Sequence, residues 1–582
     1  MTTMSRNPGR FLALAALAAC ALPSFASAQS IGYGDLGGSG ASGSPDGDEA
    51  DAATPREAGR SAHGPRSRRG AKAVEIVPYI EAAQVVDAEL SPGDEVLTYS
   101  RLAAGVDAGV SGQHNAAAVS LRYERRFGWG KKAEDSDFLS GVARGYTTIT
   151  PGVTIEAGGL ATRSSVEQVN SALASALGDN DAVTQVYSVY AGPSLATRAG
   201  DVTIGANYRF GYTRVEQPDA YVPTPGAPAN DIFDHSTVHV ADVEAGVAPG
   251  TVLPVGLGAA GSFYQEDISN LDQRVRDMQA RAIVTVPLSR TVQATGALGY
   301  EDVEISSRDA VRDATGAPVI GKDGRYKTDK SAPRVLAYDT DGLIWDVGVM
   351  WRPSPRTSLT AHVGRRYGST SYTGTLTYMP TRRSTLSLAV YDNIAGFGGQ
   401  VNRAIGDLPT DFDAVRDPLS GDLRGCVASL QGNNCLSGAL GSVRSATFRA
   451  RGVVASYAVD LGRITTGVGA GYDRRKFIAA PGTILASANG TIDENYWLAA
   501  YLNGEIDQHS GFSTNLYANW LKSGDVLFGD TSSLGATAAY YRTLTDHLHA
   551  TAAVGIDGTT YDDGLIDDLW TASALVGLRY SF

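Results

Sequence analysis

Apolar and polar residues alternate with a period of two along almost the whole chain from Val74 onward. This period is typical of β-strands with one apolar and one polar face, and no convincing helical periodicity interrupts it. No segment after residue 30 is apolar for the ~18 residues that a membrane-spanning helix needs, so an α-helical membrane protein is excluded. In segment 202–213, for example, one face carries Val202, Ile204, Ala206, Tyr208, Phe210 and Tyr212.

The connections between the predicted strands alternate between tight turns and longer polar segments. Tight turns are expected at Gly112-Gln113, Pro151-Gly152, Ala199-Gly200, Pro249-Gly250, Ser289-Arg290, 353–355, Thr381-Arg382, Leu461-Gly462, Gln508-His509 and Asp546-His547. The main longer segments are 129–139, 164–182, 214–235, 304–340, 393–443 and 475–493. Outer-membrane barrels keep this rhythm of short periplasmic turns and long extracellular loops, whereas a β-sandwich has no reason to. The sequence therefore predicts an all-β fold for residues 73–582, a closed transmembrane antiparallel up-and-down β-barrel of about 22 strands within a range of roughly 18–22.

The N-terminus predicts export from the cytoplasm. Residues 1–28 have the pattern of a signal peptide, with Arg6 and Arg10 before the apolar run 11–22 and an A-x-A cleavage site at 26–28. An alternative is a lipobox at 17–20, which would place a lipid on Cys20. Residues 29–72 are rich in Gly, Ser and charged residues, so we expect a disordered periplasmic segment. That segment either is a solvated leader or docks to peptidoglycan or a periplasmic partner.

The C-terminus ends on an alternating apolar strand. Val576, Leu578, Tyr580 and Phe582 share one face, and the pattern resembles the C-terminal signal that the barrel-assembly machinery recognises. This resemblance implies that the barrel-assembly machinery and periplasmic chaperones are partners during biogenesis. The expected location is the outer membrane, with outer-membrane lipid and lipopolysaccharide as surroundings and the N-terminal segment in the periplasm.

Three segments resemble a known family. Segments 77–81, 121–127 and 338–345 are similar to a porin-like outer-membrane β-barrel family of alphaproteobacteria, of sphingomonad type, whose sequences are sometimes labelled preprotein translocase subunit YajC. True members of the YajC family are short and have one membrane helix, which does not match this chain. The porin-like resemblance implies a channel. Other similar barrels belong to polysaccharide export, which keeps export open as a function.

Charged residues of both signs fall on the predicted inner face. The alternation predicts as lumen-facing charges Arg122, Glu124, Arg126, Arg209, Asp242, Glu244, Asp277, Arg281, Asp346, Arg352, Arg366, Arg449, Arg451, Glu505 and Arg579. Mixed charge across a pore tunes ion selectivity. The alternative is that these residues form ion pairs that only avoid desolvation.

The longest loop, 393–443, contains the last two cysteines, Cys426 and Cys435. An exported protein meets an oxidising periplasm, so we expect a disulfide between them. The loop either folds inward and sets the size limit of the lumen, or lies outward at the surface.

Several chemistries are disfavoured. The net charge of −13 argues against nucleic acid as a partner. The eight histidines form no recognisable catalytic or metal motif, so we expect neither an enzyme nor a cofactor. Asp562, Asp563, Asp567 and Asp568 either bind a divalent cation or form a solvated acidic loop. The predicted function is a porin-like channel for passive passage of small hydrophilic solutes or ions. The alternatives are a component of polysaccharide or protein export and a structural or adhesive surface barrel.

Overall fold

A computed structural model describes residues 73–130, 135–165, 183–216, 233–321, 325–408, 410, 412–421, 423–428, 434–435, 445–524, 529–562 and 567–582. The predicted signal peptide, Cys20 and segment 29–72 lie outside these residues. The elements of the barrel wall are β1 (Ala73–Ser91), β2 (Val96–Ser111), β3 (Asn115–Trp129), β4 (Ser136–Thr150), β5 (Val153–Ser165), β6 (Val183–Ala199), β7 (Val202–Glu216), β8 (His235–Val247), β9 (Gly256–Ile268), β10 (Gln273–Pro287), β11 (Val292–Ser307), β12 (Val335–Ser354), β13 (Thr357–Arg366), β14 (Ser369–Thr381), β15 (Ser384–Ala395), β19 (Thr447–Asp460), β20 (Ile464–Ile478), β21 (Ile492–Glu505), β22 (Ser510–Lys522), β23 (Thr531–Thr543), β24 (Leu548–Tyr561) and β25 (Leu569–Ser581).

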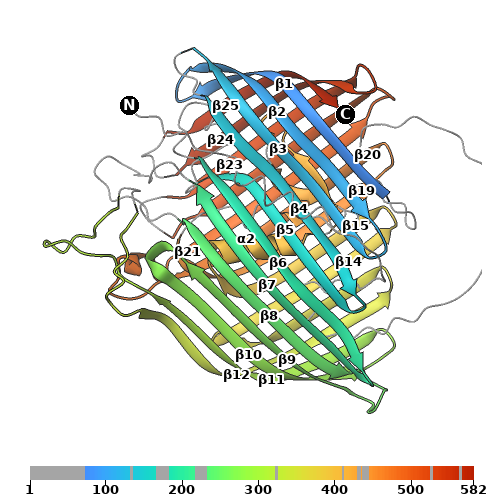
Figure 1. Cartoon of the computed structure of the whole chain (residues 1–582), viewed down its shortest axis with the longest axis vertical. Helices are drawn as coiled ribbons and strands as arrows, with labels where there is room; N and C mark the ends of the chain where they lie inside the picture. Colours follow the sequence, from blue (N-terminus) through green and yellow to red (C-terminus); the bar gives the residue numbers. More distant parts are fainter. Residues whose placement is uncertain are drawn as a thin grey trace, which may run out of the picture.

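These strands form one sheet of 22 strands that closes on itself (Figure 1). Each strand pairs antiparallel with the wall strand before it in sequence, and β1 pairs with β25 from Tyr79 opposite Ser581 to Ser91 opposite Trp570. Closure leaves no edge strand in the barrel, and the ladder pairs the backbone groups around the circumference except along part of the joint between β14 and β15. The prediction of an up-and-down barrel of about 22 strands is therefore confirmed.

The two ends of the barrel differ in their connections. At one end, called here the tight-turn end, the connections are short. Their lengths range from that of segment 355–356 to that of segment 248–255. At the other, the long-loop end, they include 308–334 and 396–446, together with the short connections 92–95 and 367–368. The first strand, β1, begins at the tight-turn end, and the last strand, β25, finishes there. At this point the Phe582 N–H donates to the Pro78 carbonyl. The predicted alternation of tight turns and longer loops is present.

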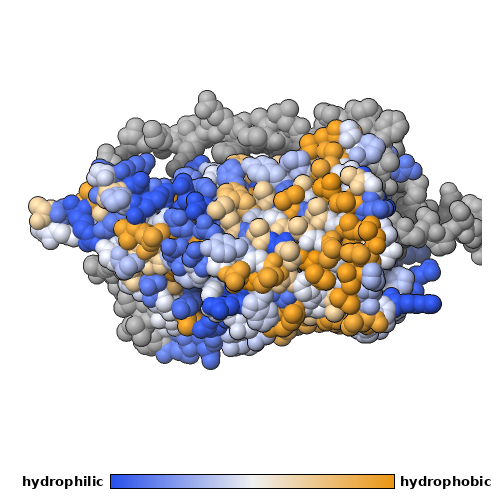
Figure 2. Space-filling model, turned by 90° about the horizontal axis from the view of Figure 1, so that it is seen from below, coloured by the Kyte–Doolittle hydropathy of each residue, from blue (hydrophilic) through white to orange (hydrophobic). Residues whose placement is uncertain are grey.

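The outward face of the wall is apolar. Leu343, Val576 and Leu298 are 71%, 69% and 61% exposed on it. Figure 2 shows apolar residues gathered over much of one face of the molecule and hydrophilic residues toward its left end, where the long loops lie in Figure 1. Water disfavours so large an apolar exterior, whereas hydrocarbon accommodates it. Val576, Leu578, Tyr580 and Phe582 all belong to this outward face.

One seam in the wall is short. β14 and β15 pair only from Gly374 opposite Val390 to Tyr378 opposite Leu386, and again at Thr381 opposite Ser384. Toward the long-loop end from these pairs, β15 stays paired with β19 as far as Ala395 opposite Phe448. Side chains replace the missing part of this ladder.

Two arginines of β19 bridge this seam. Arg449 donates to the Ser369 Oγ at 2.7 Å, and Arg451 donates to the Thr370 carbonyl at 3.0 Å. Asp392 of β15 accepts two bonds of 2.7 Å from Arg449 and lies 3.2 Å from Arg451, and its side chain is 2% exposed. The buried carboxylate therefore holds both guanidinium groups against the β13–β14 turn.

We expect Arg449→Ala to destabilise the barrel, because it leaves the buried Asp392 with one cationic partner. Removing one partner of a buried ion pair costs about 3 kcal/mol. Urea unfolding of the refolded barrel in detergent measures this change. A matched control is Arg474→Ala, which removes an ion pair of 3.7 Å between side chains 34% and 31% exposed and should cost less than about 1 kcal/mol. Equal effects of the two variants would contradict the bridging role.

Candidate functional site

The connection between β15 and β19 enters the barrel. Its described residues 396–408, 410 and 412–421, called here the internal segment, include the helix α2 (Phe397–Gly406) and the strand β16 (Asp413–Arg416). α2 packs against β5, β6, β7, β8 and β15 and lies within the outline of the barrel in Figure 1. Of the two alternatives for loop 393–443, these described residues take the inward one. The alternation had predicted no helix here.

An apolar cluster holds α2 against the wall. Phe397, Val401 and Ile405, spaced by four residues, are each 0% exposed. They belong to one buried cluster with inward-facing wall residues such as Val186 and Val215. Residues four apart lie on one face of a helix, so this face of α2 is fully used for docking.

A buried carboxylate anchors the start of α2. Glu266 of β9 is 0% exposed, and its carboxylate accepts bonds from the Gly396 N–H at 2.6 Å and the Gly399 N–H at 2.9 Å. The Tyr264 hydroxyl donates to the same carboxylate at 2.7 Å. A carboxylate at a helix N-terminus satisfies amide groups that the helix leaves unpaired. The approach needs glycine, because a Cβ at Gly399 would lie 1.9 Å from the Tyr264 hydroxyl.

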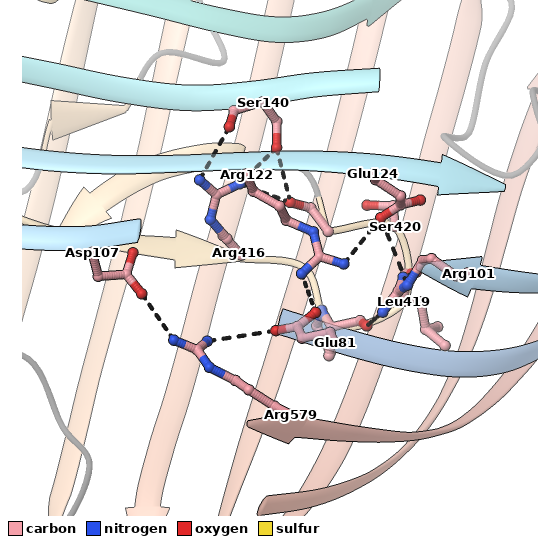
Figure 3. Close-up of polar contacts among 12 residues, drawn as sticks. Glu81, Arg101, Asp107, Arg122, Glu124, Ser140, Arg416, Leu419, Ser420 and Arg579 are labelled. Carbon is pink, nitrogen blue, oxygen red and sulfur yellow. Dashed lines mark hydrogen bonds and ion pairs between the residues drawn. The ribbon is translucent and has the colours of Figure 1, made fainter. Parts of the chain in front are cut away.

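The far end of the internal segment contacts another part of the wall. Arg416 donates to the Ser140 Oγ at 2.7 Å and the Ser120 Oγ at 3.1 Å, which lie on β4 and β3 (Figure 3). Arg101 of β2 donates to the Leu419 carbonyl. The Leu419 side chain packs into a cluster with Val85, Tyr99, Ala539, Ala553 and Leu575. The segment thus runs from β15 to the strands around the β1–β25 closure.

An ion-pair network surrounds this second contact (Figure 3). The Glu124 carboxylate lies 2.7 Å from Arg126, 3.1 Å from Arg122 and 3.6 Å from Arg101. Arg122 also pairs with Glu81, and Arg579 lies 3.0 Å from Asp107. Because each arginine has a carboxylate partner, the network joins wall strands to one another beneath the internal segment.

Burial inside the barrel differs between its two halves. In β7, the inward-facing Thr213 and Val215 near the long-loop end are 0% and 1% exposed, whereas Thr203 near the tight-turn end is only partly buried. In β25, Thr571 is 0% exposed and the Arg579 side chain is 33% exposed. In these strands the long-loop half of the interior is therefore more closely packed than the tight-turn half.

Most of the predicted lumen charges lie on the inward face of their strands. Further pairs join Arg209 to Glu156 at 2.6 Å, Arg281 to Asp346 at 3.2 Å and Arg366 to Asp277 at 2.7 Å. The inward-facing set is Arg122, Glu124, Arg126, Arg209, Asp242, Glu244, Asp277, Arg281, Asp346, Arg352, Arg366, Glu505 and Arg579. Their effect on ion selectivity stays a prediction.

Arg449 and Arg451 require a correction. They share the face of β19 that carries Val453 and Tyr457, which are 36% and 37% exposed on the outside of the barrel. The opposite face carries the buried Phe448 and Ala450. The physical reason is that charges are also stable on the outward face near a strand end, above the apolar part of the wall, so charge alone does not identify the lumen.

The two cysteines lie opposite each other in a small sheet of β16, β17 (Leu423–Ala428) and β18 (Asn434–Cys435), where the register pairs Cys426 with Cys435. Their disulfide stays a prediction.

The predicted acidic loop of four aspartates is described only in part, because Asp563 lies outside the described residues. Among the residues that the structure describes, no group of three or more His, Cys, Asp or Glu is arranged to hold a metal ion. Within the same ranges, no helix is both long and apolar enough to cross a bilayer.

Comparisons with known proteins give fold likenesses only. No protein-family profile and no curated protein matches the chain. Among solved structures, the ferric-catecholate import receptor Fiu from E. coli K12 is 10% identical with a TM-score of 0.41, covering 89% of this chain and 82% of that one. The FrpB iron transporter from Neisseria meningitidis is 10% identical with a TM-score of 0.40, covering 87% of this chain and 82% of that one. The siderophore receptor PirA from Acinetobacter baumannii is 8% identical with a TM-score of 0.39, covering 87% of this chain and 80% of that one.

We expect Glu266→Ala to loosen the internal segment while leaving the wall intact, because Gly396, Gly399 and Tyr264 lose their common acceptor. Hydrogen bonds to charged groups contribute about 1.5–3 kcal/mol each. Limited proteolysis of the folded barrel, read by mass spectrometry, should show faster cleavage within 396–421. Glu505→Ala, at an inward carboxylate near the tight-turn end of β21, is the control. Unchanged cleavage in Glu266→Ala would argue against the anchor.

Proposed function

We propose that this chain is an outer-membrane channel for the passive passage of small hydrophilic solutes or ions, and that the internal segment sets its size limit. The observation that carries this proposal is that the internal segment contacts two separate parts of the inner wall. A segment fixed at both ends inside a polar lumen narrows the passage without needing a separate N-terminal plug.

The physical character of the wall supports a place in the outer membrane. Its outward face is apolar and its ladder is closed, which are the two requirements for β-strands in hydrocarbon. We propose that the long loops face outward from the cell, that the tight turns face the periplasm, and that residues 29–72 lie on the periplasmic side. Because the described sheet starts at the tight-turn end, this orientation agrees with where such a segment would emerge.

The resemblance to porin-like barrels of alphaproteobacteria favours the same proposal, and we assign no catalytic role to the chain. A second candidate is gated export of a polymer. The close packing of the long-loop half of the interior favours it, since a polymer could pass only if the internal segment moved aside. A structural or adhesive role would rest on the long loops instead.

Single-channel conductance in planar bilayers tests the channel. Residues 29–582 should give small discrete openings, and replacing 397–421 by a short Gly-Ser linker should enlarge them severalfold because the constriction is gone. Shortening the connection 308–334 is the control and should leave the conductance unchanged. If the Cys426–Cys435 disulfide forms and holds the loop in the path, a reductant should also change the openings.

Silence of both the intact chain and the linker variant, with the fold verified by heat-modifiable migration, would overturn the channel proposal. Silence of the intact chain with large openings of the variant would favour gated export.

A further inference from the structure

A cluster of cations lies on the outward face of the barrel, on strands β19 to β22 near the long-loop end. The register places Arg451, Arg474 and Lys522 in one row across the strands, with Glu494 between the last two. Arg449 lies opposite Lys476 in the next row toward the long-loop end. Lys476 and Lys522 are exposed, and the Arg451 side chain is 37% exposed, whereas the Arg449 side chain is 14% exposed beside Asp392. We call these five cations the outward cationic surface.

An aromatic row lies directly below these cations, on the tight-turn side. Tyr472, Tyr496 and Trp520 are consecutive in the register, and the two tyrosine rings are 4.9 Å apart. Tyr496 and Trp520 are 38% and 46% exposed on the outside. Aromatic side chains concentrate at the boundary between hydrocarbon and headgroups. The outward cationic surface is therefore at headgroup height if the barrel spans a membrane.

Three nearby carboxylates are already engaged. Asp530, which precedes β23 beside Lys522, accepts from the Ser523 N–H at 3.1 Å. Asp392 is buried between Arg449 and Arg451. Glu494 accepts from the Tyr472 hydroxyl at 3.1 Å and lies 3.7 Å from Arg474. Five cations and three carboxylates give this surface a net positive charge, although the whole chain carries a net charge of −13.

Another part of the wall shows that this charge is local. On the outward face of β11 and β12, toward the long-loop end from the exposed Tyr300 and Leu343, Asp302 lies opposite Asp341 and Glu304 lies opposite Asp339. Arg276 of β10 is the cation that contacts this group, at 3.3 Å from Glu304 and 3.9 Å from Asp302. The two surfaces hold opposite charges at similar positions relative to the apolar wall.

We propose that the outward cationic surface binds the phosphate groups of a phosphorylated glycolipid in the membrane leaflet at the long-loop end. Guanidinium groups match phosphate oxygens in geometry, and the lysines add point charge. The aromatic row beneath would contact the upper acyl chains while the cations hold the headgroup. This inference rests on the membrane location in the proposed function and is independent of whether the lumen conducts.

Lipid titration followed by native mass spectrometry tests the site on the delipidated full barrel in detergent. Diphosphoryl lipid A should bind more tightly than phosphatidylcholine, and salt should weaken its binding. In the variant R474Q/K476Q/K522Q, which keeps Arg449 and Arg451 at the seam, the affinity should fall by about a hundredfold, since each cation near an anionic surface contributes about fivefold.

The matched control is D302N/E304Q/D341N on the acidic wall, which should leave lipid A affinity unchanged. Heat-modifiable migration of every variant verifies that the barrel is folded. Equal affinity of the intact chain for the two lipids, or an unchanged affinity in the cation variant, would overturn the proposal. Loss of lipid binding in a variant that still conducts would separate this site from the channel.

Discussion

The pairing of backbone hydrogen bonds around a closed ladder is the constraint on which the rest of the structure depends. Hydrocarbon offers no partner for an amide or a carbonyl, so a strand wall in a membrane is stable only when the first and last strands meet. Pairing of β1 with β25 meets this requirement. Once the wall is closed, outward residues are selected for lipid and inward residues for one another, which explains the alternation along each strand.

The interior solves a second problem, because a barrel this wide has more inward surface than its own side chains cover. The internal segment fills part of it, and its docking needs polar as well as apolar contacts. Glu266 satisfies the amides at the start of α2, while Arg101 and Arg416 join the far end to the wall. Each of these groups would be costly if buried alone, so the segment and the wall stabilise each other only in the docked arrangement.

The wall was predictable from sequence to a greater extent than the interior. Period two assigns the outward face of β25 and the inward face of β3 correctly, since one side of each strand faces apolar surroundings along most of its length. It fails at Arg449 and Arg451, because at this end of β19 the inward face carries the apolar Phe448 and Ala450 and the outward face is charged, so polarity no longer marks the lumen. The spacing of Phe397, Val401 and Ile405 was a signal for α2. The bond from Gly396 to Glu266 spans 130 residues, and no local pattern encodes it.

The short ladder between β14 and β15 is one joint in a ring that the pairing of β1 with β25 closes, so a break there would open the wall into a single strip that begins at β15 and ends at β14. Every other joint between neighbouring strands has a longer run of paired residues than the five consecutive pairs from Gly374 to Tyr378. A ladder that is pulled apart fails first where the fewest bonds share the load. Mechanical extraction of the protein from a membrane should therefore open the barrel at this joint, and the internal segment, which continues from β15, would be pulled away from β5, β6, β7 and β8.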